Sequence, residues 1–142
     1  ISGKILEMKN IGSCLCKKVT FEVKKFCGPI GHCHCTMCQK FHGAAFSTFV
    51  EVKQTDLTWL SGKEFLKEFK ADNNSIRSFC SCCGSSLLFE SNYNRADKTI
   101  EIALASFDKH QQVTPDAHIY TDTKVDWFDI NDDLVKHHQY RS

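Results

Sequence analysis

The chain has 142 residues and a net charge of +1, with 18 basic and 17 acidic side chains. Hydrophobic residues make up 42% and charged residues 25%, the usual balance of one globular domain. The near-neutral charge argues against a nucleic-acid partner or an anionic membrane surface, and no apolar run approaches the roughly 20 residues of a transmembrane helix. We therefore expect a single domain over residues 1–142, with no nucleic-acid or membrane partner.

Strand-like alternation dominates the chain from its first third onward. Residues 18–23 place Val19, Phe21 and Val23 on one face of an extended segment. Segments rich in aromatic and β-branched residues follow, which favours further strands. These segments are 46–52, 65–70, 77–81, 87–91 and 99–107.

Turn and helix signals are fewer. Gly62 and residues 72–75 and 91–97 indicate turns. A short helical turn is expected over 37–42, and a weakly periodic segment over 122–138 is the other helix candidate. The sequence therefore predicts a mainly β fold with little helix, in which Phe41, Trp59 and Trp127 pack in the core.

Nine cysteines are more than a domain of this length needs for stability, because it can bury enough surface to fold without cross-links. Their odd number argues against a complete disulfide framework. The first ten residues lack the apolar core of a signal peptide, which favours a reducing compartment, and cytoplasm is the expected location. Metal binding is therefore the main expectation for the thiols, ahead of disulfides or inert buried cysteines.

Two cysteine pairs have the spacing of one closed metal site. Side chains two residues apart on a strand project from the same face, so Cys14 and Cys16 direct their sulfurs at one point. Cys80 and Cys83 do the same across a tight turn, with Gly84 expected in a positive-φ conformation. Four thiolates are the usual ligands of a tetrahedral structural zinc.

The remaining cluster, Cys33, Cys35 and Cys38, combines both spacings. Three protein ligands with an open fourth position are the arrangement of a catalytic zinc. A closed structural site is the alternative, in which Cys27, Cys82 or a histidine supplies the fourth ligand.

The histidines around this cluster have weaker signals. His34 is expected to face away from the sulfurs if the segment is extended. His32 and His42 are candidates for acid–base or supporting roles. Nucleophile-elbow, phosphate-loop and dinucleotide-binding motifs are absent from the sequence.

Four segments in this order resemble the glutathione-dependent formaldehyde-activating family, which includes centromere protein V-like members. They are "GSCLCKKVTFEV" (12–23), "GHCHCTMCQKFHGAAF" (31–46), "FCSCCGSSLLF" (79–89) and "HIYTDTKVDWFDI" (118–130), and the resemblance extends over about 12–134. It implies an Mss4-like β-tent, small antiparallel sheets organised around two zinc ions per chain. The structural zinc falls on Cys14, Cys16, Cys80 and Cys83, and the catalytic zinc on Cys33, Cys35 and Cys38.

The activity implied by the resemblance is that of a carbon–sulfur lyase. It resembles S-(hydroxymethyl)glutathione synthase, which adds glutathione or another small thiol to an aldehyde such as formaldehyde. A non-catalytic, zinc-stabilised binding module of the same fold is the alternative. The chain departs from the family where Lys17 replaces the glycine after the first cysteine pair. A lysine is tolerated at this turn if its φ stays negative, and the change concerns the local turn geometry and not the ligands.

Overall fold

The computed structural model describes residues 10–109 and 113–141. This part of the chain forms eleven short strands, two α-helices and four 3-10 turns. The strands are β1 (Asn10–Ser13), β2 (Thr20–Val23), β3 (Ile30–Cys33), β4 (Ser47–Lys53), β5 (Leu57–Ser61), β6 (Leu66–Lys70), β7 (Ile76–Cys80), β8 (Ser86–Glu90), β9 (Thr99–Ala103), β10 (Ala117–Ile119) and β11 (Val135–Lys136). The helices are α1 (Thr36–His42) and α2 (Asn92–Asp97), and the 3-10 turns are η1 (Gln54–Asp56), η2 (Lys63–Phe65), η3 (Leu104–Ser106) and η4 (Thr121–Thr123).

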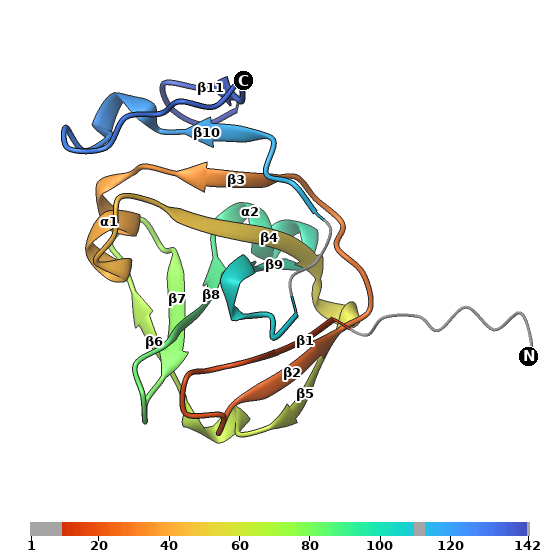
Figure 1. Cartoon of the computed structure of the whole chain (residues 1–142). Helices are drawn as coiled ribbons and strands as arrows, with labels where there is room; N and C mark the ends of the chain where they lie inside the picture. Colours follow the sequence, from red (N-terminus) through yellow and green to blue (C-terminus); the bar gives the residue numbers. More distant parts are fainter. Residues whose placement is uncertain (1–9, 110–112, 142) are drawn as a thin grey trace, which may run out of the picture.

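The strands form one large and one small sheet (Figure 1). The large sheet has the order β11-β10-β3-β4-β9-β8-β7-β6, and the small one has the order β1-β2-β5. Pairing is antiparallel except that β10 runs parallel to β3 and to β11. In Figure 1 the large sheet curves from β10 and β3 at the top to β6 and β7 at the left, and the small sheet lies below it. The expectation of a mainly β fold with little helix is confirmed.

The hydrophobic core fills the space between the two sheets. Val19, Phe21 and Val23 are all buried, as their alternation predicts. The Phe21 ring packs edge-to-face on Trp59, with centroids 5.9 Å apart. Trp127, by contrast, is 75% exposed, so its predicted place in the core is wrong.

The helix predictions were partly right. α1 confirms the helical turn expected over 37–42, and Gly62 (φ +74°) lies in a turn between strands. The candidate over 122–138 is wrong, because this segment is irregular except for the end of η4 and the two-residue strand β11. Residues 91–97, expected to be a turn, contain α2, whose capping box between Ser91 and Asn94 stabilises the first turn.

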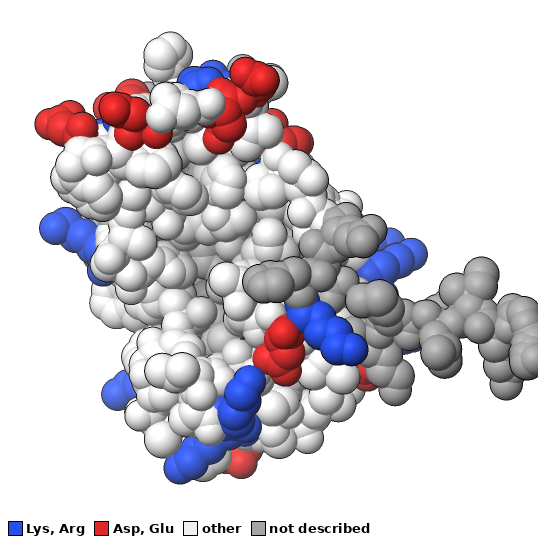
Figure 2. Space-filling view, viewed as in Figure 1, with Lys and Arg blue, Asp and Glu red and all other residues white. Residues whose placement is uncertain are grey.

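Neither helix of the described chain, seven and six residues long, has the length and apolarity needed to cross a membrane. Acidic side chains gather at the top of the molecule, over the C-terminal segment around β10 and β11 (Figure 2). Lysine and arginine side chains are spread along the flanks and lower edge of the same view.

Candidate active site

The first cysteine group joins two segments that lie far apart in the sequence. Sγ of Cys16 lies 3.5 Å from Sγ of Cys14 and 3.9 Å from Sγ of Cys80, which is 64 residues away. With Cys83, the four sulfurs all lie within 4.8 Å of one another. Tetrahedral zinc with bonds of about 2.3 Å requires sulfur separations of about 3.8 Å, so both the donors and their spacing fit zinc.

Turns, and not strand pleating, bring these sulfurs together. Cys14 follows the end of β1 and Cys16 lies in the next turn, so the expected placement of both on a strand is wrong. Cys80 ends β7 and Cys83 lies in the turn before β8, as the sequence predicts. The first group therefore connects the small sheet to the large one.

Each of these two turns contains a residue with a positive φ. Gly84 has φ +80°, as expected, and its N–H donates to the Cys80 carbonyl at 2.7 Å. Lys17 has φ +69°, so the condition of a negative φ, under which a lysine is easily tolerated there, is not met. A left-handed conformation costs a non-glycine residue about 1 kcal/mol, but the Lys17 ammonium donates to Ser13 Oγ at 3.0 Å and pairs with Asp108 at 3.5 Å.

The second cysteine group lies where β3 passes into α1. Cys33 ends β3, Cys35 is the N-cap of α1, and Cys38 lies in its first turn. The Cys35 sulfur accepts a hydrogen bond from the backbone N–H of Cys38 at 3.3 Å. All three sulfurs lie within 4.8 Å of one another, so strand end and helix start form a cup of three donors.

The electrostatics of this three-cysteine cup favour a bound cation. Hydrogen bonds from Cys33 and Cys38 lower the pKa of Cys35 to about 2. The same contacts raise the pKa of Cys33 above its ordinary value. Two thiols thus stabilise one thiolate, whereas three thiolates at this spacing need a positive charge between them. A soft divalent ion such as zinc fits this donor set.

Among the described residues, no further histidine, cysteine or carboxylate joins the three-cysteine cup. Cys27 and Cys82 are both exposed and belong to neither group. The alternative in which either cysteine closes the second site therefore finds no support in the geometry.

His32 and His34 form hydrogen bonds with residues outside the three-cysteine cup. His34 is buried, and its Nε2 lies 2.8 Å from Nδ1 of His118, whose own Nε2 lies 2.9 Å from an Asp132 oxygen. His32 contacts Thr48 Oγ1 at 2.7 Å. His34 thus connects the segment between two sulfur ligands to β10 and the C-terminal segment.

A cavity of about 730 Å³ opens beside the three-cysteine cup, and Cys33, Cys35 and Cys38 all line it. His32, His34 and His42 do not line it, so the candidate acid–base roles of His32 and His42 find no support in this cavity. Two charged residues, Arg77 and Glu101, share the cavity with the sulfurs. Five aromatic residues complete much of its wall: Phe49, Phe89, Tyr93, Tyr120 and Tyr140.

Arg77 links the cavity to the cup. It is only 4% exposed, and its Nη2 donates to Sγ of Cys38 at 3.5 Å. A guanidinium next to a thiolate withdraws negative charge from the sulfur, which would leave a metal bound there more electrophilic. Arg77 is therefore placed to tune the cup as well as to line the cavity.

Glu101 is the acidic group of the cavity. It lies on β9 directly opposite Glu51 of β4, on the face away from the core residue Ile102. Burial, with a smaller contribution from the Glu51 charge, raises the pKa of Glu101 to about 7. A carboxyl group with this pKa exchanges protons near neutral pH.

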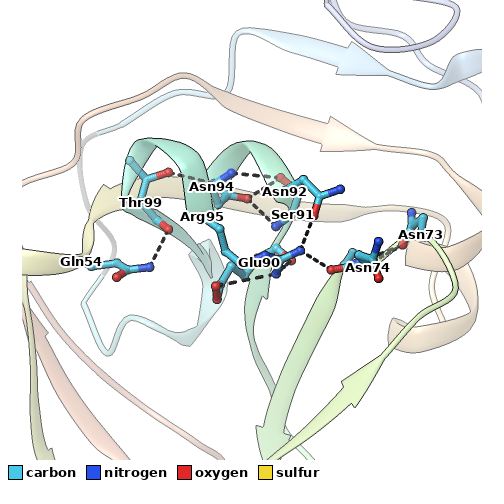
Figure 3. Close-up of polar contacts among 10 residues, drawn as sticks. Gln54, Asn73, Asn74, Glu90, Ser91, Asn92, Asn94, Arg95 and Thr99 are labelled. Carbon is cyan, nitrogen blue, oxygen red and sulfur yellow. Dashed lines mark hydrogen bonds and ion pairs between the residues drawn. The ribbon is translucent and has the colours of Figure 1, made fainter.

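A polar network holds the rim of the cavity in place (Figure 3). Arg95 of α2 donates one hydrogen bond to the Asn74 carbonyl and another, of 2.7 Å, to Asn92 Oδ1. It also forms an ion pair with Glu90 at 3.8 Å. The turn before β7 is thereby fixed against α2. Rim residues from both segments, Asn73, Ser75, Ser91 and Asn92, line the cavity.

The sequence arguments did not identify Arg77 and Glu101 as site residues. Each is a charged residue inside a short strand, Arg77 at the second position of β7 and Glu101 at the third of β9. This placement could have identified both as candidate site residues, because a charged side chain on a strand face requires a partner or a cavity.

Comparisons with known proteins agree with the cysteine pattern. The family model described as glutathione-dependent formaldehyde-activating enzyme matches residues 9–123. A Schizosaccharomyces pombe protein named as an uncharacterized lyase is 26% identical over 119 residues, which covers 84% of this chain and 83% of that protein. The crystal structure of a Rhodobacter sphaeroides protein matches with a TM-score of 0.59 at 20% identity, over 74% of this chain and 91% of that one, and shows likeness of fold. With its cysteine groups and the extent of the family match, the chain belongs to the glutathione-dependent formaldehyde-activating enzyme family.

Proposed function

We propose that this protein is a zinc-dependent carbon–sulfur lyase that makes and breaks the adduct of a small thiol with an aldehyde. Glutathione and formaldehyde are the first substrates to test, because the family name refers to both. The observation that carries the proposal is the cup of three cysteines opening into a cavity large enough for a small ligand.

The proposed reaction needs no external oxidant or reductant. In the synthetic direction a sulfur–carbon bond forms between the thiol and the carbonyl carbon, and the thiol proton ends on the former carbonyl oxygen. Zinc held by Cys33, Cys35 and Cys38 would supply a position at which a thiol ionises readily. The cavity walls hold both reactants together, which replaces a bimolecular encounter by a positioned one.

Glu101 is the residue we assign to proton exchange in the cavity. Its carboxylate oxygen would take the proton that leaves the thiol and return it to the developing alkoxide. The pKa of about 7 suits both steps, since the group is present in both protonation states near neutral pH.

The direct test is turnover of the purified protein with glutathione and formaldehyde, because this reaction also proceeds without a catalyst. We expect acceleration above the uncatalysed rate, and about two zinc ions per chain by metal analysis, from the two cysteine groups. Removal of zinc by a chelator should abolish the acceleration, and zinc should restore it. No acceleration by protein with both sites loaded would exclude these substrates and favour the binding-module alternative.

Replacing Glu101 with glutamine should lower turnover by about 10², the contribution of a positioned acid–base group. The wild-type rate should change with pH around 7, and this change should be lost in Glu101→Gln. The groups that face Glu101 are Glu51 from β4, Arg77 from β7, Cys38 from α1, Asn94 from α2 and Tyr140 from the C-terminal segment. A pH–rate profile of both proteins is the measurement.

Glu101→Gln should also change how the stability of the fold depends on pH. Because the folded-state pKa is raised, wild type should lose stability as pH rises from about 4.5 to about 7, and Glu101→Gln should lose less. Glu68→Gln is the matched control, since Glu68 is exposed on β6 and does not line this cavity. Turnover and pH profile unchanged in Glu101→Gln would remove Glu101 from the mechanism.

A further inference from the structure

Arg77 carries more hydrogen-bonding capacity than the described protein satisfies. Its Nε and Nη1 atoms are buried and have no hydrogen-bond partner among the described residues, while Nη2 donates to Cys38. No described carboxylate forms an ion pair with it. Leaving buried charged donors unsatisfied is costly, so an acceptor is expected at this position.

The guanidinium is held rigidly by its neighbours. Its carbon lies 4.8 Å from the centre of the Phe89 ring and 5.6 Å from that of Phe41. Cation–π contacts with two rings, together with the bond to Cys38, fix the plane of the group. A fixed guanidinium loses little entropy on binding an acceptor and is therefore suited to recognition.

We propose that the cavity beside the three-cysteine cup binds a ligand carrying a carboxylate, and that Arg77 recognises this carboxylate. The proposal rests on the proposed function and deepens it, because it assigns the recognition of a carboxylate on the thiol substrate to one residue. Arg77 lies on the cavity wall and contacts Cys38, so one small molecule can reach both the guanidinium and the sulfur cup.

The charges of the cavity favour a carboxylate over a phosphate. Glu101 and the three thiols are already acidic groups of this cavity, and Arg77 is the one basic residue among the described residues that line it. One guanidinium can offset the single charge of a carboxylate, whereas a phosphate near −2 would meet repulsion from the acidic groups. The aromatic wall, which includes Phe49, Phe89 and Tyr93, suits an apolar body between carboxylate and sulfur.

Two ligand pairs test the proposal on the zinc-loaded protein. The sulfur-free pair is 3-phenylpropanoate and its neutral amide, and the thiol pair is 3-mercaptopropanoate and its amide. Dissociation constants come from ligand-observed NMR titration. We expect wild type to prefer each carboxylate over its amide by roughly 10- to 100-fold, as for a hydrogen bond to a charged group.

Variants of Arg77 assign the preference to this residue. Arg77→Met should reduce the preference for each carboxylate over its amide to below about 3-fold. Arg77→Lys keeps the charge without the planar fork and should retain part of the preference, which covers the case in which Arg77→Met does not fold. Lys70→Met, at an exposed position on β6 outside the cavity, is the control for loss of one positive charge and should keep the full preference.

The possible results separate this proposal from the proposed function. Equal binding of 3-phenylpropanoate and its amide by wild type would overturn carboxylate recognition, even if the protein turns over glutathione. A carboxylate preference that survives in Arg77→Met would overturn the role of Arg77. If 3-phenylpropanoate is preferred but neither thiol binds, carboxylate recognition stands and the thiol chemistry is wrong.

Discussion

Replacing Cys80 with serine is expected to abolish one zinc site and to destabilise the fold by several kcal/mol, enough to unfold most of the protein at 37 °C. Binding of a structural zinc contributes on the order of 10 kcal/mol to folding, which is comparable to the whole stability of a domain. The Cys80 sulfur is fully buried at the junction of the two sheets, so a serine hydroxyl there would also lack a partner. Thermal unfolding by circular dichroism, with zinc content per chain, is the measurement.

Cys82→Ser is the matched control for this experiment. Cys82 lies in the same turn but is exposed and outside both cysteine groups, so we expect a change within about 0.5 kcal/mol and no loss of zinc. A Cys80→Ser protein that keeps two zinc ions and the wild-type melting temperature would contradict a structural role for the first group.

Replacing Cys35 with serine should remove the other zinc and reduce turnover by at least about 10³, while the protein remains folded. The substitution is mild for the helix, because Cys35 is the N-cap of α1 and serine is among the preferred N-cap residues. Loss of one of three donors leaves two thiols for the ion, which are too few for a stable site. Zinc content, circular dichroism and glutathione–formaldehyde turnover should be measured on the same sample.

Cys27→Ser provides the comparison, since Cys27 is exposed and belongs to neither group. It should keep zinc, fold and turnover at wild-type levels. If Cys35→Ser unfolds as completely as Cys80→Ser, the second group is structural, and the binding-module alternative gains support.

The cysteine groups were predictable because ligand spacing is a local property. Separations of two or three residues allow sulfurs to converge in several backbone conformations, so the sulfurs of each group lie together although Cys14 and Cys16 lie outside a strand. The place of Arg77 and Glu101 beside the three-cysteine cup was not predictable in this way. They share a cavity only because β7, β8, β9 and β4 are neighbours in the large sheet, and that order depends on long-range pairing.

The errors in secondary structure have a similar origin. The 122–138 segment contains apolar residues at irregular spacing, and its contacts with β10 and His118 replace helical hydrogen bonds. α2 was missed because a helix of six residues is marginal by itself, and its stability comes from a capping box and from Arg95 contacts that the sequence pattern does not display.

The two cysteine groups differ in the number of residues that separate their members along the sequence. From this difference we expect one group to be able to form before the other. Cys33, Cys35 and Cys38 lie within six consecutive positions, so they can capture an ion as soon as this short segment has been synthesised. The other group must close a loop of 64 residues between Cys16 and Cys80 before its sulfurs meet, and it forms only once β7 is available. We therefore expect the three-cysteine cup to be able to form earlier during synthesis than the group that connects the two sheets.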